Sequence, residues 1–346
     1  MLSKSRILNN SVSPTTPSFT LSALDDCVEA LVNLDVCILP TETVYGLACS
    51  ALSEVAVQKV FKLKGRPSTN PLIVHVLSHD SAEEICQTNN MSKILTDHFW
   101  PGPLTLVLPK KSCIPHAVSA GLSSVAVRSP SHPVFRRVLE IIKIPLAAPS
   151  ANLSNKLSTT TLKDAIDAFG SECPPIIDGG NCELGIESTV LDLTTLTPSI
   201  LRNGPISQKQ IENILDLKIN DCSHLSNGSD KLLRKSPGQG LKHYSPNTPL
   251  FLHSSFQSMI TSQIIQEDEI VIFPKVNCDS SEIKNSFNFF LSTDGGYKET
   301  AKNLYRTLRA ADKLNKNKIH ISLYSIQNES FLPINDRLNR ASYKRV

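Results

Sequence analysis

The chain has 346 residues, of which 40% are hydrophobic and 19% are charged. Because one hydrophobic core seldom serves more than about 250–300 residues, this length predicts two domains. The chain has 35 Lys and Arg against 32 Asp and Glu residues, a net charge of +3, which is too small to indicate nucleic-acid binding by itself. No apolar run reaches the ~18 residues that a membrane helix needs, so we expect no membrane association.

The stretch 1–19 is rich in Ser, Thr, Pro and Asn, and the first acidic residue is Asp25. Its only basic residues are Lys4 and Arg6, and it has no amphipathic period. We therefore predict a flexible tail rather than a targeting segment. The nine cysteines form no Cys-x-x-Cys pair and lie mostly in apolar surroundings. This pattern favours buried thiols in a reducing compartment, and we expect a cytoplasmic protein.

Short apolar runs alternate with amphipathic helical segments up to about residue 217. The predicted helices cover 21–34, 53–64, 92–99, 134–142 and 162–169, with one more capped by Ser207. The predicted strands are the apolar runs 36–39, 72–76, 104–108, 125–128, 145–148, 176–178 and 188–193. This alternation is typical of an α/β domain with a mixed sheet, and we assign it to 20–217.

The stretch 218–248 is polar, rich in Ser, Asn, Gly and Pro, and without periodicity, which is the composition of a linker. Beyond it, apolar runs at 250–253, 269–273 and 318–324 predict strands. The segment 298–314 carries a clear apolar helical face. A second, smaller α/β domain is therefore predicted at 249–346.

Polar residues follow several of the apolar runs, at the positions where α/β proteins bind ligands. The segment 40–46 follows the first run, and Lys64 and Arg66 flank a glycine after the second helix. Cationic, hydroxyl and amide groups end or follow other runs: Arg128, Ser150, Asn152, Ser188 and Arg202. Each alone also fits a polar turn or a helix end. If they converge on one sheet edge, they form a cleft for a nucleotide and a small anionic ligand.

The common phosphate-binding motifs do not occur in the sequence. There is no Gly-x-x-x-x-Gly-Lys-Ser/Thr loop, and Gly238-Gln239-Gly240 lacks the third glycine of a dinucleotide fingerprint. His75 and His79 are four residues apart at the end of a predicted strand, and no helix is predicted to carry them both. This setting favours a structural or ligand-binding histidine over a metal ligand.

Taken in order, the motifs resemble those of the Sua5-type threonylcarbamoyl-AMP synthases. The resemblance runs from the first helix to the last residues and rests on these segments: Pro40-Thr41-Glu42-Thr43-Val44-Tyr45-Gly46, Lys64-Gly65-Arg66, Asn70-Pro71-Leu72-Ile73-Val74-His75, Trp100-Pro101-Gly102-Pro103-Leu104-Thr105, Ala126-Val127-Arg128, Pro149-Ser150-Ala151-Asn152, Gly185-Ile186-Glu187-Ser188-Thr189, Ser236-Pro237-Gly238, His243-Tyr244-Ser245-Pro246 and Asn335-Asp336-Arg337-Leu338. It implies a YrdC-like catalytic domain with a twisted mixed sheet and an open cleft. A linker over the active site and a Rossmann-like Sua5 domain would follow.

The resemblance also implies a nucleotidyltransferase reaction, in which L-threonine, bicarbonate and ATP give threonylcarbamoyl-AMP and pyrophosphate. A downstream threonylcarbamoyl transferase complex then modifies adenosine 37 of tRNAs that read codons beginning with A. A carbamate is a weak nucleophile, so its attack on the α-phosphate depends on positioning and charge neutralisation. Mg²⁺, held mainly by the ATP phosphates, would supply part of that neutralisation. No organic cofactor is expected, and no residue is nominated as general base.

By the same resemblance, Lys64 and Arg66 grip the ATP phosphates and are the catalytic residues. The nucleotide site further includes Asn70, Ser124, Asn152, Thr160, Arg202 and Tyr244. The threonine site consists of Thr43, His75, Arg128, Ser150 and Ser188, with Arg128 as the partner of the substrate carboxylate. Tyr244 is expected to lie over the nucleotide and to help close the cleft. Two positions depart from the commonest family pattern, Asn155 in place of glycine and Thr159 in place of proline, and both precede Thr160.

Two other functions deserve comparison with this one. A YrdC-like domain has a basic concave face that suits weak contact with tRNA or double-stranded RNA, but the low net charge and the absence of a Lys/Arg run argue against binding as the main role. A carbamoyl-phosphate enzyme of hydrogenase maturation would share the fold. Such enzymes carry acylphosphatase and zinc-finger segments, and this sequence has neither the added length nor a Cys-x-x-Cys pair.

Overall fold

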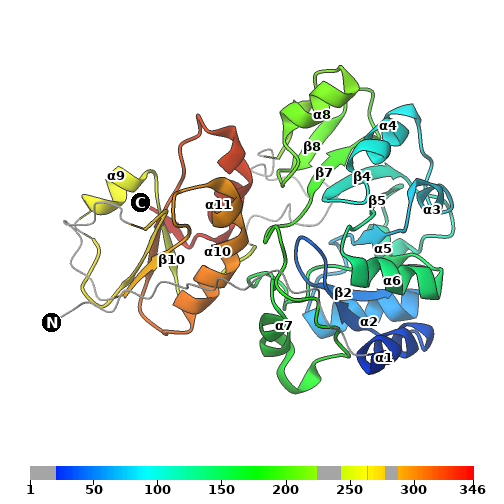
Figure 1. Cartoon of the computed structure of the whole chain (residues 1–346), viewed down its shortest axis with the longest axis horizontal. Coiled ribbons are helices and arrows are strands. Elements are labelled where there is room, and N and C mark those ends of the chain that lie inside the picture. Colours follow the sequence, from blue (N-terminus) through cyan, green and yellow to red (C-terminus); the bar gives the residue numbers. More distant parts are fainter. Residues whose placement is uncertain (1–20, 224–242, 263, 277–286) are drawn as a thin grey trace.

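The computed structural model describes residues 21–223, 243–262, 264–276 and 287–346. The predicted tail at 1–19 and the segment Ser236-Pro237-Gly238 lie outside the described residues. The described residues form two domains, each with its own sheet (Figure 1).

Nine strands of the described chain form the first sheet, in the order β1-β2-β6-β3-β5-β4-β7-β8-β9. They are β1 (Cys37–Leu39), β2 (Gly46–Ser50), β3 (Ile73–His75), β4 (Leu104–Pro109), β5 (Ser124–Arg128), β6 (Leu146–Ala147), β7 (Thr189–Asp192), β8 (Ser199–Arg202) and β9 (Asn220–Asp221). The pairs β3/β5, β4/β7 and β8/β9 are parallel and the others antiparallel. The predicted mixed sheet is confirmed.

Helices cover the two faces of this sheet unequally. One face packs against α2 (Glu54–Lys64), α4 (Asn90–Phe99), α5 (His116–Ser119), α7 (Leu162–Phe169) and α8 (Gln208–Leu215) around the main apolar core. On the other face, α1 (Leu21–Val32) and α6 (Pro133–Ile142) contribute to a second core that involves β1, β2 and β6. The short helix α3 (His79–Glu83) precedes α4.

The rest of that second face carries a small apolar cluster of side chains: Ile73, Val107, Ala126, Val190 and Leu201. These residues belong to β3, β4, β5, β7 and β8, whose alternate side chains enter the main core on the opposite face. Among the described residues no helix contributes to this cluster, and Ile73 extends it into the candidate site.

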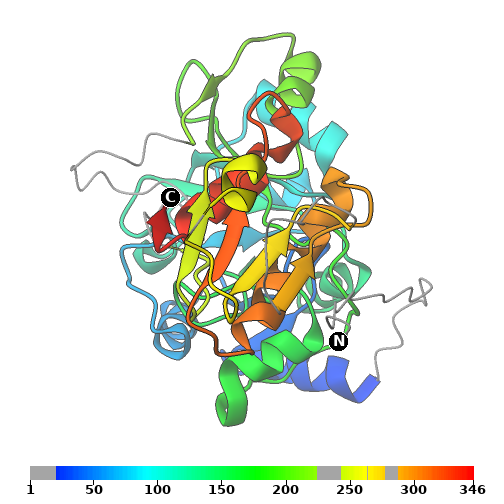
Figure 2. The same ribbon diagram turned by 90° about the vertical axis from the view of Figure 1, so that its left-hand side faces the viewer.

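The second sheet contains five parallel strands of the described chain, in the order β12-β11-β13-β10-β14. They are β10 (Leu250–His253), β11 (Ile270–Phe273), β12 (Phe287–Phe290), β13 (Ile319–Ser322) and β14 (Lys344–Arg345). The short helix α9 (Phe256–Ile260) packs on one face. On the other face, α10 (Tyr297–Asp312) and α11 (Leu332–Ala341) lie between this sheet and the first domain (Figures 1 and 2).

Several elements differ from the sequence prediction. The run 176–178 forms only an isolated bridge between Ile38 and Ile176. The strand β9 lies inside the predicted linker and extends the first sheet. The strands β2, β8 and β12 and the helix α11 were not predicted, and α11 carries the Asn335-Asp336-Arg337-Leu338 motif.

Candidate active site

A cavity of about 50 Å³ lies over the open part of the first sheet. Most of the predicted site residues line it: Thr43, Arg66, His75, Arg128, Ser150, Ser188, Arg202 and Tyr244. Ile73, Gly46 and Ala148 complete its floor. The polar groups therefore converge over a face of the sheet, and not at one edge as the sequence suggested. Neighbouring strands such as β3 and β6 run in opposite directions, so residues that follow them leave the sheet at opposite ends and reach the cavity from both sides.

The parallel pair β3/β5 places His75 directly beside Arg128. Both side chains are buried, and the ring of His75 also contacts Phe135, with the centroids 5.1 Å apart. Burial, followed by the charge of Arg128, lowers the pKa of His75 to about 3. The imidazole is therefore neutral at physiological pH, and its Nδ1 has no hydrogen-bond partner among the described residues.

Arg128 is held from three sides. Its Nε donates to the carbonyl of Gly102 at 3.2 Å, its Nη1 donates to Oγ1 of Thr43 at 2.9 Å, and its Nη2 lies 2.7 Å from Oε1 of Glu42. The segment 40–46 is also a polar turn, because Oγ1 of Thr41 accepts the backbone N–H groups of residues 43 and 44. The same turn thus fixes its own backbone and presents Thr43 and Glu42 to the guanidinium.

The helix α2 ends so that two cations reach the site. Gly65 has φ of 57°, in the left-handed region that favours glycine, and its N–H bonds the carbonyls of Phe61 and Lys62. Nζ of Lys64 then donates to the carbonyls of Ser150 and Asn152, and Nη2 of Arg66 donates to the carbonyl of Pro71 at 3.0 Å.

Burial, followed by the charge of Arg66, holds the pKa of Lys64 well below its ordinary value. Within the described ranges no carboxylate forms an ion pair with Lys64, whose hydrogen bonds go to backbone carbonyls. Lys64 and Arg66 are thus two buried basic side chains, and no described carboxylate pairs with Lys64. Such a pair is suited to an anionic ligand.

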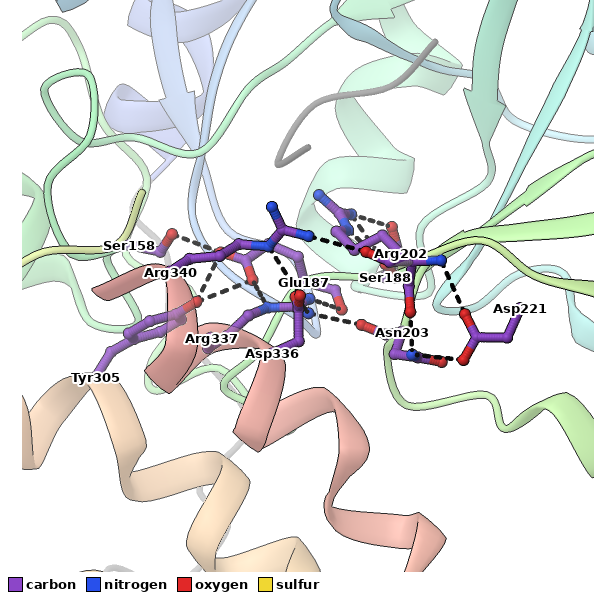
Figure 3. Close-up of polar contacts among 11 residues, drawn as sticks. Ser158, Glu187, Ser188, Arg202, Asn203, Asp221, Tyr305, Asp336, Arg337 and Arg340 are labelled. Carbon is purple, nitrogen blue, oxygen red and sulfur yellow. Dashed lines mark hydrogen bonds and ion pairs between the residues drawn. The ribbon is translucent and has the colours of Figure 1, made fainter. Parts of the chain in front are cut away.

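Ser188 and Arg202 form a second polar wall, shown in Figure 3. Nε and Nη2 of Arg202 donate to the carbonyl of Ser188 at 3.0 and 2.9 Å, and Nη2 also donates to its Oγ at 3.1 Å. The Oγ atoms of Ser188 and Thr105 are 2.7 Å apart. Burial lowers the pKa of Arg202 from its usual value. This wall is built at the start of β7 and the end of β8, which are neighbours in the sheet.

Five predicted residues do not line the cavity: Lys64, Asn70, Ser124, Asn152 and Thr160. Lys64 is linked to the cavity by its hydrogen bond to the carbonyl of Ser150. Asn70 is linked to it by its carbonyl, which accepts a hydrogen bond from Nε of Arg66. Ser124 shares a sheet face with Arg128 but lies at the other end of β5, roughly 13 Å along the strand. Oδ1 of Asn152 and Oγ1 of Thr160 are buried and have no hydrogen-bond partner among the described residues.

The segment 243–246 closes the cavity from above. Tyr244 is 2% exposed, adopts φ of 61°, and packs its ring 4.0 Å from that of His243 and 5.7 Å from that of Tyr305. The guanidinium carbon of Arg337 lies 5.5 Å from the centroid of the Tyr244 ring. Burial lowers the pKa of His243 to about 3. Both His243 and Tyr244 line the cavity, so this part of the predicted linker is a wall of the site.

Backbone bonds hold this wall to both domains. The N–H of His243 donates to the carbonyl of Arg340 at 3.1 Å, and the N–H of Ser245 donates to the carbonyl of Asn155 at 2.9 Å. Asn155 has φ of 66°, and asparagine tolerates the left-handed region better than most residues. The substitution of asparagine for the usual glycine therefore keeps a backbone conformation that glycine would favour.

Sequence reasoning missed three side chains at the site, Glu42, Glu187 and His243. Glu42 pairs with Arg128, and Glu187 and His243 line the cavity. All three lie inside motifs that carried the resemblance, so membership in those motifs was the available signal. The described residues contain no group of three or more His, Cys, Asp or Glu side chains placed to hold a metal ion. None of the described helices is long and apolar enough to cross a membrane.

Comparison with known proteins covers both domains. The family model named for Sua5, YciO and YrdC and described as "Telomere recombination" matches residues 29–204. The model described as "Threonylcarbamoyl-AMP synthase, C-terminal domain" matches residues 206–342. A threonylcarbamoyl-AMP synthase of Pyrococcus abyssi is 37% identical over 280 residues, which are 79% of this chain and 81% of that protein.

The similarity extends to a eukaryotic relative and to a solved structure. A threonylcarbamoyl-AMP synthase of Schizosaccharomyces pombe is 33% identical, covering 94% of this chain and 90% of its own length. The crystal structure of P. abyssi Sua5 complexed with L-threonine superposes with a TM-score of 0.84 at 31% identity, covering 93% of this chain and 96% of that one. The chain belongs to the Sua5 family, in its two-domain form.

Proposed function

We propose that the chain is an L-threonylcarbamoyladenylate synthase, which makes threonylcarbamoyl-AMP and pyrophosphate from L-threonine, bicarbonate and ATP. One observation carries the proposal: Arg128, a buried arginine flanked by a threonine hydroxyl and a neutral histidine, lines the same cavity as Arg66. The first group suits the carboxylate and hydroxyl of an amino acid, and the second suits phosphates. The relatives named threonylcarbamoyl-AMP synthase support this assignment.

In this proposal Thr43, His75, Arg128, Ser150 and Ser188 bind threonine. Lys64, Arg66, Asn70, Ser124, Asn152, Thr160, Arg202 and Tyr244 serve the nucleotide. Threonine carbamate attacks the α-phosphate, the P–O bond to the leaving pyrophosphate breaks, and the cations offset the charge on the leaving group. Mg²⁺ arrives with ATP and stays mainly on phosphate oxygens, because Glu42 and Glu187 are already engaged by arginines.

The cavity is smaller than the ~300–1,000 Å³ that usually hold a ligand, since it measures about 50 Å³. Binding of ATP therefore requires the segment 243–246 to withdraw, and its return would exclude water from the reactive adenylate. We place the enzyme in the cytoplasm. We further propose that the adenylate passes to a threonylcarbamoyl transferase complex for adenosine 37 of tRNA, and that any contact with tRNA or double-stranded RNA is weak.

The direct test is mass spectrometry of the protein incubated with Mg-ATP, L-threonine and ¹³C-bicarbonate. We expect threonylcarbamoyl-AMP that carries the heavy carbon, together with pyrophosphate. Reactions without threonine or without bicarbonate are the controls. Pyrophosphate that forms equally without threonine, or a complete reaction without any adenylate, would contradict the proposal.

A further inference from the structure

Glu187 is a buried carboxylate on which the two domains converge (Figure 3). Within the first domain, Oγ of Ser158 donates to its Oε1 at 2.5 Å. From the second domain, the hydroxyl of Tyr305 donates to Oε2 at 3.0 Å, and Nε of Arg337 donates to the same oxygen at 3.0 Å. Burial pushes the pKa of Glu187 upward, but Arg337, Arg202 and the Ser158 bond together hold it below its usual value.

Arg337 reaches this carboxylate from α11 and is only 1% exposed. Its Nη1 donates to the carbonyl of Asn203 at 2.7 Å and to Oδ2 of Asp336 at 2.9 Å. Its Nη2 is 3.4 Å from the carbonyl of Glu187 itself. One planar guanidinium thus fixes residues 187 and 203, which flank Ser188 and Arg202 in the chain.

The loop before Glu187 is also pressed against the second domain. Gly185 has φ of +73°, and a Cβ atom there would lie 2.5 Å from Cα of Lys302 and 2.7 Å from the carbonyl of Ala301 in α10. Only glycine permits this approach. The backbone that supplies Ser188 to the cavity is therefore held from α10 by contact and from α11 by the Arg337 guanidinium.

We propose that Arg337 is a positioning residue of the active site, which sets the binding geometry of Ser188 and Arg202 through Glu187 and Asn203. This inference rests on the proposed function. It gives the Asn335-Asp336-Arg337-Leu338 motif, which contains none of the proposed ligand-binding residues, a role in positioning the site. It also makes the second domain a part of the catalytic apparatus, since the side chain touches no substrate but fixes the groups that do.

The alternative is that Arg337 only holds the domains together. Arg340 gives the matched control, because it lies one turn further along α11, is also buried, and pairs with the other oxygen of Asp336 at 2.8 Å. Its Nη2 donates to the carbonyl of Ser223 at 3.2 Å, so its side chain links α11 to the first domain at residue 223. A docking role predicts the same effect from both substitutions.

The test compares Arg337→Met, Arg337→Lys and Arg340→Met in the full chain, by calorimetry with L-threonine in the presence of ATP and by adenylate synthesis. Since displacement of a site by about 1 Å can lower rates a hundredfold, we expect Arg337→Met to weaken threonine binding at least tenfold. Arg340→Met keeps the backbone carbonyl that accepts the N–H of His243, and it should weaken threonine binding much less than Arg337→Met does. Arg337→Lys keeps the charge but loses the planar fork, so it should fold and still lose affinity.

A double-mutant cycle with Ser188→Ala separates positioning from docking. If Arg337 acts through Ser188, the losses of threonine affinity from Arg337→Lys and Ser188→Ala will not add. Strictly additive losses, or equal losses from Arg337→Met and Arg340→Met, would overturn the proposal. Wild-type protein that neither binds threonine nor makes the adenylate would instead overturn the proposed function, so the two failures can be told apart.

Discussion

Glu42 and Arg128 form a buried ion pair beside the cavity, with Oε1 of Glu42 2.7 Å from Nη2 of Arg128. The resemblance gives Arg128 the substrate carboxylate as its partner, and in the structure Glu42 already pairs with it. A substrate carboxylate would therefore share the guanidinium with Glu42. The pair also holds Arg128 in place before any ligand arrives, which limits the ordering that binding requires.

Arg128→Met should abolish measurable threonine binding while ATP affinity stays within a few-fold. Removal of one partner from a buried ion pair lowers stability by about 3–5 kcal/mol, so urea unfolding must accompany the calorimetry. The double variant Glu42→Gln/Arg128→Met removes both charges and should recover much of the stability but none of the threonine binding. Equal weakening of both ligands in the folded double variant would indicate a structural role.

Arg66→Ala should reduce pyrophosphate release roughly ten- to a hundredfold, because one charge-assisted hydrogen bond contributes about 1.5–3 kcal/mol. Lys62→Ala is the control, since Lys62 is exposed on the same last turn of α2. The measurement is a coupled pyrophosphate assay, with circular dichroism to verify the fold. Wild-type turnover in folded Arg66→Ala protein would remove Arg66 from the phosphate site.

Tyr244→Ala should leave both domains folded and lower adenylate synthesis at least tenfold, because water then enters the cavity that the Tyr244 ring closes. Tyr343→Ala, which removes an exposed tyrosine of the second domain, is the control and should retain wild-type rates. We also expect ATP with threonine to slow proteolysis at 243–248. Unchanged proteolysis together with full activity of Tyr244→Ala would mean that the segment only connects the domains.

The buried histidines predict how stability depends on pH. His75 and His243 have folded-state pKa values of about 3, below the ~6.5 of an unfolded chain. The unfolded chain therefore takes up protons first as the pH falls. The contribution of these two histidines to the free energy of unfolding is fully present above about pH 7, and it is lost as the pH falls from about 6.5 to about 3. Each histidine should remove about 1.4 kcal/mol between pH 7.5 and 5.5.

Urea unfolding of wild type and His75→Gln at pH 7.5 and 5.5 measures the contribution of His75 to the pH dependence of stability. The stability difference between pH 7.5 and 5.5 should shrink by about 1.4 kcal/mol in the variant. An identical pH dependence in both proteins would show that His75 is not held neutral in the fold.

Much of the fold was predictable because local signals agreed with the packing. The helix at 54–64 combines the Ser53 cap, an apolar face and the Gly65 stop, and each is present in the structure. The strand β2 was missed because Gly46-Leu47-Ala48-Cys49-Ser50 has no β-branched residue. The helix α11 was missed because its polar residues, Arg337 among them, are buried against the other domain, so it shows no simple apolar face.

Half of the residues that line the cavity could be named from the sequence, but their arrangement could not. Periodicity places His75 and Arg128 at strand ends, but only the parallel pairing of β3 with β5 makes them neighbours. Likewise, the sequence near Glu187 does not indicate which cation pairs with this carboxylate, because Arg337 lies 150 residues away. Long-range pairs of this kind depend on how the second domain docks, which local patterns do not encode.

The separation of Glu187 from Arg337 has a consequence for biosynthesis. At ~5–20 residues per second, a ribosome needs roughly 8–30 s to make the intervening chain, which spans 150 positions. Throughout this interval Glu187 lacks the Arg337 guanidinium that bonds its carboxylate. With the positioning role proposed for Arg337, the site of a nascent chain is complete only after α11 has emerged from the ribosome.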